Sequence, residues 1–290
     1  MGEVVYLNGR LVAADDAEVG VFDRLVLYGE GLFETMRVYG GKPFALGEHL
    51  ERLCRSAEDL ELSLCCSPQE MREAVLRTIE GNGIAEGYVR LTVSGGTGDV
   101  RDGEDGGSLF VYARDGLPYG DELYERGVQV VIAEERGHRD TKLSRHKTTS
   151  YMENVVALRR AHGQGAEEAL FLTADDEVAE GTRSNVFAVM DGVLTTPPLE
   201  MNILPGITRA KVLEAAKGLG MRSVEKSFLL SELARASEVF ITSSLMELMP
   251  AAKVGDVVLP ECPGPVTEKL SDAYGKLVYS SVKGTGQGGV

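Results

Sequence analysis

The chain has 290 residues and is strongly acidic, because 30 Lys+Arg oppose 45 Asp+Glu and leave a formal charge of −15 with neutral histidines. Hydrophobic residues make up 43% and charged residues 26%, an ordinary composition for one large globular domain or two modest ones. The acidic excess would repel a phosphate backbone, and no dense Lys/Arg block offsets it. We therefore expect no binding to nucleic acid.

The sequence gives no sign of secretion or of a membrane segment. Met1 to Tyr6 has neither the basic segment nor the apolar run of a signal peptide. No apolar run approaches the ~18 residues that a membrane helix needs. The four cysteines, Cys54, Cys65, Cys66 and Cys262, show no Cys-x-x-Cys spacing, so a disulfide framework is not expected. These features favour a cytoplasmic protein with no membrane contact.

The amino-terminal part alternates strand and helix patterns. Asn8-Gly9 suits a tight hairpin turn, and apolar residues at three- and four-residue spacing after Glu48 predict a helix with one buried face. Ser67-Pro68-Gln69-Glu70 is a capping box, and Gly81-Asn82-Gly83 ends the helix that it opens. The expected elements are hairpins at 4–12 and 32–46, helices at 48–62 and 68–80, and strands at 88–94 and 109–113. The polar, glycine-rich loop 95–107 between these strands is of a kind that often lies over a binding site.

Gly116-Leu117-Pro118-Tyr119-Gly120 interrupts both periodicities and is the best candidate linker. After it we expect strands at 128–133, 169–173, 186–190, 193–196 and 239–242, and helices at 151–161 and 206–219. The predicted domains are an amino-terminal α/β domain at 1–116, a linker at 117–125 and a carboxy-terminal domain at 126–282. The glycine-rich tail 283–290 is expected to be disordered.

Several common catalytic motifs are missing. The four histidines, at positions 49, 138, 146 and 162, form no His-x-x-x-His pair, so no metal site is expected. Neither Gly-Lys pair is followed by Ser or Thr, which excludes a P-loop. Gly96-Thr97-Gly98 lacks the third glycine of a dinucleotide fingerprint, and there is no Gly-x-Ser-x-Gly elbow.

Four residues could carry chemistry, although each has a simpler explanation when taken alone. Lys147 in a polar loop would ordinarily be a solvated charge. Glu180 before a glycine would be a turn carboxylate, and Arg52 a solvated helix residue. Thr208 near a helix start is explained by ordinary capping.

Their order along the chain changes this interpretation. The sequence resembles the fold type IV (class IV) pyridoxal-phosphate aminotransferases over roughly residues 3 to 275. This family includes branched-chain aminotransferases, D-amino acid aminotransferases and 4-amino-4-deoxychorismate lyases. Six motifs carry the resemblance, in order: Tyr28-Gly29-Glu30-Gly31-Leu32-Phe33-Glu34-Thr35, His49-Leu50-Glu51-Arg52-Leu53, His146-Lys147-Thr148-Thr149-Ser150-Tyr151, Glu180-Gly181-Thr182-Arg183-Ser184-Asn185-Val186-Phe187, Leu204-Pro205-Gly206-Ile207-Thr208-Arg209, and Thr242-Ser243-Ser244 leading to Met249-Pro250.

The resemblance implies pyridoxal 5'-phosphate (PLP) as cofactor and Lys147 as the catalytic lysine that forms the Schiff base. An amine is a nucleophile only when neutral, and an unperturbed ammonium has a pKa of ~10.4, so the site must favour the neutral or imine form. Glu180 matches the carboxylate that keeps the pyridine nitrogen protonated. The ring can then accept the electron pair left on the substrate Cα.

Other matching residues are implied to bind the phosphate and the ring. Arg52 matches the phosphate-binding arginine, and the helix start after Gly206 offers N–H groups to an anion. Tyr151 stands four residues after Lys147, where branched-chain members have five, so its role stays open. The expected cofactor-binding residues are Arg52, Lys147, Tyr151, Glu180, Ser184, Asn185, Leu204, Gly206, Ile207, Thr208, Ser243 and Ser244.

Tyr88-Val89-Arg90 resembles the Tyr-x-Arg pair that branched-chain aminotransferases use on the substrate side. Positions two apart on a strand share a face, so a phenol and a guanidinium could together bind carboxylates. Phe33 and Leu245 are the other expected substrate contacts. We therefore expect transamination between a branched-chain L-amino acid and a 2-oxo acid. D-amino acid transamination ranks lower, because Asp102-Gly103 follows Arg101 where that branch carries Arg-x-His.

Two other functions remain open. Ser244-Leu245-Met246 with Met249-Pro250 resembles the corresponding turn of the lyases, which release pyruvate from aminodeoxychorismate without a keto-acid acceptor. A non-catalytic vitamin-binding or carrier protein is the third possibility. The implied fold is α/β (α+β), with a small amino-terminal domain, a larger barrel-like carboxy-terminal domain and the cofactor between them. The resemblance also implies a homodimer or larger assembly.

Overall fold

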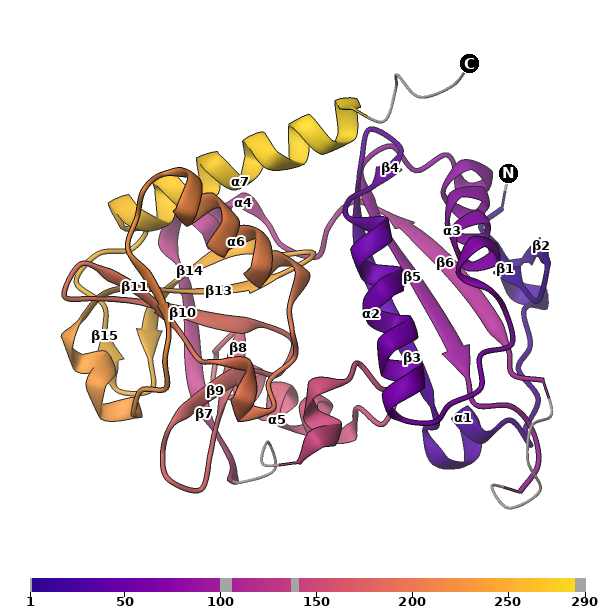
Figure 1. The fold of residues 1–290 in the computed structure, drawn as a ribbon, viewed down its shortest axis with the longest axis horizontal. Helices are drawn as coiled ribbons and strands as arrows, with labels where there is room; N and C mark the ends of the chain where they lie inside the picture. Colours follow the sequence, from indigo (N-terminus) through magenta and orange to yellow (C-terminus); the bar gives the residue numbers. More distant parts are fainter. Residues whose placement is uncertain (1, 100–105, 137–140, 285–290) are drawn as a thin grey trace. The chain divides into compact units, whose positions relative to one another are not determined.

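The structure, a computed structural model, describes residues 2–99, 106–136 and 141–284 and divides the chain into two compact units (Figure 1). Unit 1 comprises Met1–Leu117, His146–Tyr151 and Ser281–Val290, and unit 2 comprises Pro118–Arg145 and Met152–Ser280. The short segment that carries Lys147 therefore belongs to unit 1, although the chain on both sides of it belongs to unit 2. The sequence assigns this lysine to the carboxy-terminal domain.

Unit 1 is built on a six-stranded antiparallel sheet with the strand order β2-β1-β6-β5-β3-β4. The strands are β1 (Val4–Leu7), β2 (Arg10–Ala13), β3 (Gly31–Tyr39), β4 (Lys42–Pro43), β5 (Gly87–Ser94) and β6 (Leu109–Asp115). The helices are η1 (Ala14–Asp16), α1 (Arg24–Tyr28), α2 (Leu46–Asp59) and α3 (Pro68–Asn82).

The core of unit 1 lies between this sheet and helices α2 and α3. Leu50 and Leu53 of α2 and Val75 of α3 are buried with Val89 and Val111 of the sheet in one apolar cluster. Full burial of each such side chain stabilises the fold by about 1.5–3 kcal/mol. The spacing of these residues on α2 is therefore what fixes which face of the helix meets the sheet.

Unit 2 is a nine-stranded mixed sheet with the order β12-β11-β10-β13-β14-β7-β8-β9, in which β15 also pairs with β14, and it curls into a half-barrel. The strands are β7 (Val128–Arg136), β8 (Glu168–Leu172), β9 (Val178–Gly181), β10 (Asn185–Met190), β11 (Val193–Thr196), β12 (Ser223–Glu225), β13 (Ala236–Ser243), β14 (Glu247–Val254) and β15 (Val257–Val258). The helices are α4 (Asp121–Arg126), η3 (Lys142–Arg145), α5 (Met152–Gly163), η4 (Leu199–Met201), α6 (Ile207–Gly218), η5 (Leu230–Arg235) and α7 (Pro265–Gly284).

The interior of unit 2 is a second, separate apolar cluster. Strands β8, β10 and β13 contribute Leu170, Val186 and Ile241, which are buried, and their buried runs read as near-continuous apolar segments. A smaller cluster joins Ala161 of α5 to Phe171. Both units thus combine helices with a sheet, which confirms the predicted mixed α and β class.

Most local predictions are confirmed where a turn or cap specifies the element. The hairpin at Asn8-Gly9 forms, and helix α3 begins at the predicted capping box, in which Ser67 N donates to Glu70 Oε2 over 2.7 Å. The hairpin predicted at 32–46 forms, but the prediction made its second strand too long. Its second strand ends at Pro43, and Leu46 begins α2 after Ala45 turns the chain with a φ of 55°.

Helix α7 is the longest element that the sequence analysis did not predict. Its buried residues Leu270, Tyr274 and Val278 recur every four positions, so the periodic signal was present. The helix includes Lys283 and Gly284, which the sequence assigned to a disordered tail. Residues 285–290 and 100–105, which include the rest of that tail and much of the predicted loop 95–107, lie outside the described residues.

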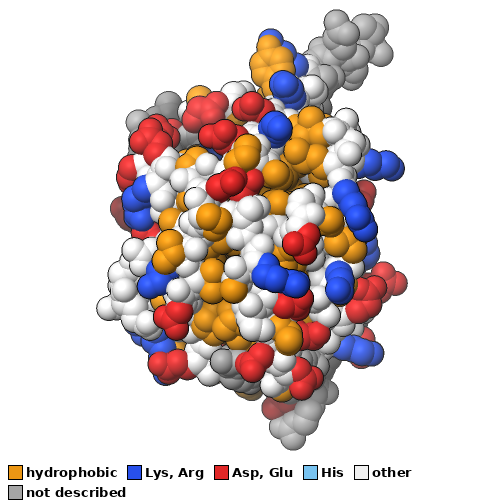
Figure 2. Space-filling view, turned by 90° about the vertical axis from the view of Figure 1, so that its left-hand side faces the viewer, with side chains coloured by type: hydrophobic (Ala, Val, Ile, Leu, Met, Phe, Trp, Pro, Cys, Tyr) orange, Lys and Arg blue, Asp and Glu red, His pale blue; other side chains and the backbone are white. Residues whose placement is uncertain are grey.

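In the part of the chain that the structure describes, no helix combines the length and apolar character required to span a membrane. Figure 2 shows one face of the molecule, on which acidic and basic side chains are interspersed with apolar ones. That face therefore carries no extended patch of a single charge, despite the net charge of −15.

Candidate active site

The Lys147 segment is fixed to unit 1 by its backbone. Phe33 N donates to the Lys147 carbonyl over 3.0 Å, and Thr149 N donates to the Gly31 carbonyl over 2.9 Å. These two bonds pair the segment with the first residues of β3. The lysine is thus held by a strand-like contact with a sheet more than a hundred residues earlier in the chain.

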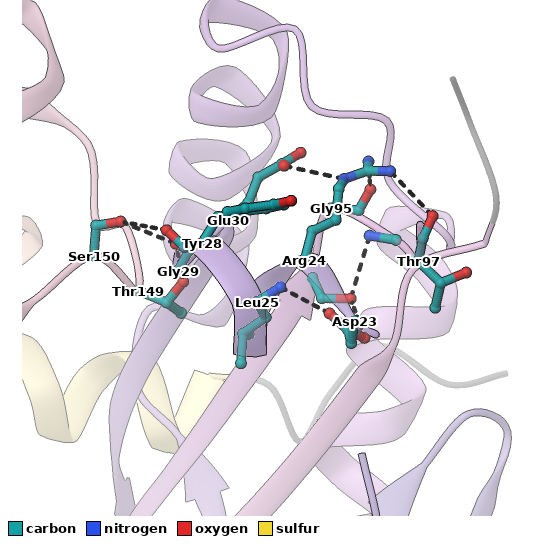
Figure 3. A network of polar contacts seen from close by, with 12 residues as sticks. Asp23, Arg24, Leu25, Tyr28, Gly29, Glu30, Gly95, Thr97, Thr149 and Ser150 are labelled. Atoms are coloured by element: carbon teal, nitrogen blue, oxygen red, sulfur yellow. Dashed lines mark hydrogen bonds and ion pairs between the residues drawn. The ribbon is translucent and has the colours of Figure 1, made fainter. Parts of the chain in front are cut away.

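Side-chain bonds add to this attachment. The Thr149 and Ser150 hydroxyls both donate to the Gly29 carbonyl, over 2.5 and 3.1 Å (Figure 3). Gly29 has a φ of +69°, and a Cβ there would lie 2.7 Å from Ser150 Oγ, so this position requires glycine. On the other side of the lysine, His146 Nδ1 lies 3.0 Å from Ser56 Oγ of α2.

The aromatic ring of Phe33 gathers three of the predicted site residues. Lys147 Nζ lies 4.5 Å from the ring centroid, and Arg90 Cζ lies 3.7 Å from it. The Tyr151 ring meets it edge-on, with centroids 5.6 Å apart. The Lys147 amine and a guanidinium suited to a carboxylate therefore share one apolar contact surface.

Tyr88 and Arg90 lie two positions apart on β5 and are both half-buried, as the predicted Tyr-x-Arg pair requires. The Tyr88 ring also packs edge-on against Tyr112 of β6. Burial raises the pKa of Tyr88, with Tyr112 adding to the rise, so its phenol stays protonated at neutral pH. Burial lowers the pKa of Arg90, which still leaves a guanidinium charged at any physiological pH.

Arg52, the predicted phosphate ligand, is held in a buried ion pair with Glu34 of β3. Its Nε and Nη2 donate to the two carboxylate oxygens over 2.8 and 2.6 Å, a bidentate arrangement. His49, one helical turn before Arg52 on α2, approaches the same carboxylate with Nδ1 at 2.6 Å. A bound phosphate would therefore share Arg52 with Glu34.

The ionisation of this cluster follows from its burial. Burial by itself would raise the pKa of Glu34, yet the charge of Arg52 and the approach of His49 bring that pKa down to about 2. Burial lowers the pKa of His49, so at neutral pH its ring is neutral and its Nδ1–H donates to the ionised Glu34. The cluster therefore holds one cation and one anion, and a phosphate would depend on directed N–H donors more than on excess positive charge.

In unit 2, Glu180 is buried at the end of β9. Its Oε2 accepts from Leu204 N over 3.0 Å and from Asn185 Nδ2 over 3.5 Å. Asn185 Nδ2 also donates to the Leu204 carbonyl over 3.0 Å. Three predicted cofactor residues, Glu180, Asn185 and Leu204, thus form one hydrogen-bonded group.

The start of α6 is close to this group. Gly206 is the N-cap and has no side chain to accept from the N–H groups of the first turn, which includes Ile207 and the buried Thr208. A Cβ on Gly206 would lie 2.0 Å from Asn185 Oδ1, so only glycine lets the backbone pass so near. This bare helix start suits an anion.

The remaining predicted residues lie in two turns of unit 2. Ser184 is in the turn between β9 and β10, where its hydroxyl donates to Glu168 over 2.9 Å. Ser243 is the last residue of β13, Ser244 and Leu245 follow it, and Ser243 Oγ accepts from Met246 N over 3.2 Å. These roles toward a cofactor or substrate stay predictions.

Three buried polar residues for which the sequence predicted no role lie beside predicted site residues. Glu34 and His49 surround Arg52, and Glu168 binds the turn that follows Glu180. The signal for Glu34 was its position in the buried run of β3, where a charge requires a partner. The sequence could not identify Arg52 as the partner of Glu34, because Arg52 lies on a different element, α2.

The donor sets suit PLP. A buried carboxylate whose orientation is fixed by Leu204 and Asn185 suits a protonated ring nitrogen, and the bare start of α6 suits a phosphate. Among the described residues there is no group of three or more His, Cys, Asp and Glu side chains that could hold a metal ion.

Comparisons with known proteins agree on one family. The sequence pattern described as amino-transferase class IV matches residues 31–254. A protein of Methanocaldococcus jannaschii named as a branched-chain-amino-acid aminotransferase is 36% identical over 93% of this chain and 94% of its own length. The aminodeoxychorismate lyase of Bacillus subtilis is 32% identical over 96% of this chain and 96% of its own length. D-alanine aminotransferases are also among the relatives.

A solved structure extends the likeness to three dimensions. The branched-chain aminotransferase of the archaeon Thermoproteus uzoniensis, crystallised with norvaline, matches with a TM-score of 0.88 and 33% identity. The match covers 97% of this chain and 96% of that one.

Proposed function

Because the chain belongs to the class IV aminotransferase family and has its fold, we propose that it uses PLP to transfer an amino group between an amino acid and a 2-oxo acid. The observation that carries this proposal is the shared contact of Lys147 and Arg90 with the Phe33 ring. An amino acid presents an amine and a carboxylate a few bonds apart, which suits an amine-reactive lysine and a guanidinium on one surface.

In the proposed reaction, bound PLP supplies an electron sink for the pair left on the substrate Cα. The Lys147 amine would hold the cofactor and, when free, would carry a proton to or from the substrate Cα. The buried Glu180 carboxylate would face the ring nitrogen and keep it protonated. Arg52, the N–H groups of Ile207 and Thr208, and Ser244 would bind the phosphate.

For the substrate, we propose a branched-chain L-amino acid as donor and a 2-oxo acid such as 2-oxoglutarate as acceptor. Arg90 and Tyr88 would bind a carboxylate, and Phe33 and Leu245 would contact an aliphatic side chain. The M. jannaschii relative and the T. uzoniensis structure, both named for branched-chain substrates, support this choice.

Steady-state assays of the purified protein test the proposal. We expect turnover of leucine, isoleucine or valine with 2-oxoglutarate, and a half-reaction in the cofactor spectrum when the donor alone is added. The proposal is wrong if none of a panel of L- and D-amino acids gives a half-reaction with the PLP-loaded protein.

Aminodeoxychorismate lyase activity is the second candidate. The B. subtilis lyase relative and the Ser244-Leu245-Met246 turn favour it. Pyruvate release from aminodeoxychorismate without an acceptor, together with no reaction of any amino donor, would establish it. Turnover of D-alanine alone would instead indicate the D-specific branch. A PLP spectrum with no reaction at all would indicate a vitamin-binding or carrier protein.

We also propose that the chain self-associates, as a homodimer or a larger assembly, through the surface around α1. Five exposed apolar residues cluster within eight positions there: Val21, Phe22, Val26, Leu27 and Tyr28. A monomer rarely exposes a large contiguous apolar patch, so this group of exposed side chains favours an interface there.

Beneath this surface, polar bonds hold α1 in place (Figure 3). Asp23 accepts from Leu25 N over 2.9 Å, and Arg24 donates to Glu30 over 3.0 Å and to the Gly95 carbonyl. The exposed side chains are therefore presented by a fixed turn. The double variant Phe22→Ser with Leu27→Ser should lower the mass in light scattering, whereas Val258→Ser, which changes a separate exposed apolar residue, should not. Equal masses for all three proteins would exclude this surface.

For the domains, we propose that 1–116 and 126–282 act as the two functional parts, joined by 117–125. We also propose a cytoplasmic location, because the four cysteines are free thiols, as a reducing compartment maintains them. Fractionation of cells that express the tagged protein at native level would test this.

A further inference from the structure

Glu168, at the start of β8, has a fully buried carboxylate whose described partners are neutral donors. Its Oε1 accepts from Ala169 N over 2.9 Å, from Thr182 N over 3.1 Å and from the Thr182 hydroxyl. Its Oε2 accepts from the Ser184 hydroxyl over 2.9 Å. Four hydrogen bonds thus converge on one side chain, and three of them come from the turn between β9 and β10.

That turn joins two residues of the candidate site. Glu180 immediately precedes Gly181, and Asn185 immediately follows Ser184, so the turn sets the separation of Glu180 and Asn185. Gly181 is required by the packing, because a Cβ there would lie 2.1 Å from Ser184 Oγ and 3.1 Å from the Glu168 carboxylate carbon. The turn is closed by Gly181 N, which donates to the Ser184 carbonyl over 2.7 Å.

The same turn is tied to its surroundings by two further bonds. Thr182 N also donates to the Ala169 carbonyl over 3.0 Å, and Asn154 of α5 donates to the Thr182 carbonyl. These bonds attach the middle of the turn to β8 and α5. At its two ends, Glu180 and Asn185 lie in β9 and β10 and bond to Leu204, while Thr182 and Ser184 between them bond to Glu168.

We propose that Glu168 is a positioning residue that acts through the turn at 181–184 to orient Glu180 and Asn185 toward the pyridine ring of PLP. The inference rests on the proposed function, because it assigns Glu180 to the ring nitrogen. Glu168 itself contacts neither substrate nor cofactor. Its effect is to hold the Glu180 carboxylate in one position, so that this carboxylate would face the ring nitrogen at one distance and angle.

Unit 2 offers a closely matched control carboxylate. Glu238 of β13 is as buried as Glu168, at 1% exposure for each. It accepts from Val266 N, Thr267 N and the Thr267 hydroxyl over 2.9, 2.8 and 2.7 Å. These donors belong to the first turn of α7, so Glu238 stabilises a helix start by the same chemistry without contacting the turn at 181–184.

The experiment compares Glu168→Gln with Glu238→Gln. PLP affinity is measured by titration of the apoprotein, the absorption spectrum of the bound cofactor is recorded across pH, and the melting temperature of each apoprotein is determined. We expect both variants to have a lower melting temperature, since each loses an acceptor for buried donors. Only Glu168→Gln should weaken PLP binding, by about tenfold or more as for other supporting partners of a binding group. It should also shift the pH dependence of the cofactor spectrum.

A milder variant guards against a failure of Glu168→Gln to fold. Thr182→Val keeps the shape of the side chain and the backbone donor but removes the hydroxyl that binds Glu168. It should shift the cofactor spectrum in the same direction by a smaller amount. If the Glu168 and Thr182 variants leave both the PLP affinity and the spectrum as in Glu238→Gln, Glu168 is structural only and the inference is wrong. If the unmodified protein itself binds no PLP, the proposed function fails, which is a different result.

Discussion

Glu34 in unit 1 and Glu168 in unit 2 are both 1% exposed, yet they are satisfied in different ways. Glu34 is paired with a cation, Arg52, and with the neutral ring of His49. Glu168 accepts four bonds from backbone N–H groups and hydroxyls. Loss of a charged partner leaves an uncompensated buried charge, whereas loss of a neutral donor leaves only an unmade hydrogen bond. The unit 1 cluster should therefore be the more sensitive to substitution and to acid.

The largest expected effect is a loss of activity at Lys147 that leaves the stability of the fold almost unchanged. Lys147→Ala should lower kcat/KM by at least ~10³-fold, equivalent to about 4 kcal/mol of transition-state stabilisation. The melting temperature should change little, because the segment is held by backbone bonds at Lys147 and Thr149 that the substitution keeps. Lys142→Ala, on the same loop but exposed, is the control and should retain activity. Activity of Lys147→Ala near the unmodified level would refute the assignment.

The comparison is tested most directly at Glu34. Glu34→Ala leaves the Arg52 guanidinium buried without its carboxylate, and breaking such a pair costs about 3–5 kcal/mol. The control is Glu3→Gln, which removes the exposed Arg114 pair of 2.8 Å and should cost below about 1 kcal/mol. Denaturant unfolding measures both. Similar losses in the two variants would show that the buried pair has no special weight.

Acid should act on the same cluster. The pKa of Glu34 is about 2 in the folded chain against 4.5 ordinarily, so its stabilisation is complete above pH 4.5 and is lost as pH falls toward 2, by about 3 kcal/mol in all. The lowered pKa of His49 acts in the same direction, because acid protonates the unfolded ring first. Unfolding free energies across this range should fall more steeply for the unmodified protein than for Glu34→Gln, with Gly163→Ala as a non-titrating control. Parallel curves for Glu34→Gln and the unmodified protein would contradict the assigned pKa.

The smallest effect concerns the neutral region. Gly181→Ala places a Cβ 2.1 Å from Ser184 Oγ, and such overpacking costs about 1–3 kcal/mol. Gly163→Ala, at the end of α5 with no atom within 4 Å of the added Cβ, should be close to neutral. Thermal unfolding compares the two. A loss as large as that of Glu34→Ala would mean that the neutral network is as sensitive as the ion pair.

The sequence alone determined the features that depend on neighbouring residues. Asn8-Gly9 specified its hairpin, and Ser67 with Glu70 specified the start of α3, because the bonds concerned join residues a few positions apart. The family could also be identified from the sequence, because the six motifs and their order are visible without knowing how the chain folds. Lys147 and Glu180 were nominated in this way as members of one site.

Only the tertiary structure decided which distant residues satisfy one another. The placement of Lys147 with β3, the pairing of Glu34 with Arg52 and the convergence of Thr182 and Ser184 on Glu168 each join separate elements. A buried charge or donor must find a partner, but the sequence gives only the requirement and not the partner. The partner is fixed by how the helices and strands pack, which is a property of the whole chain.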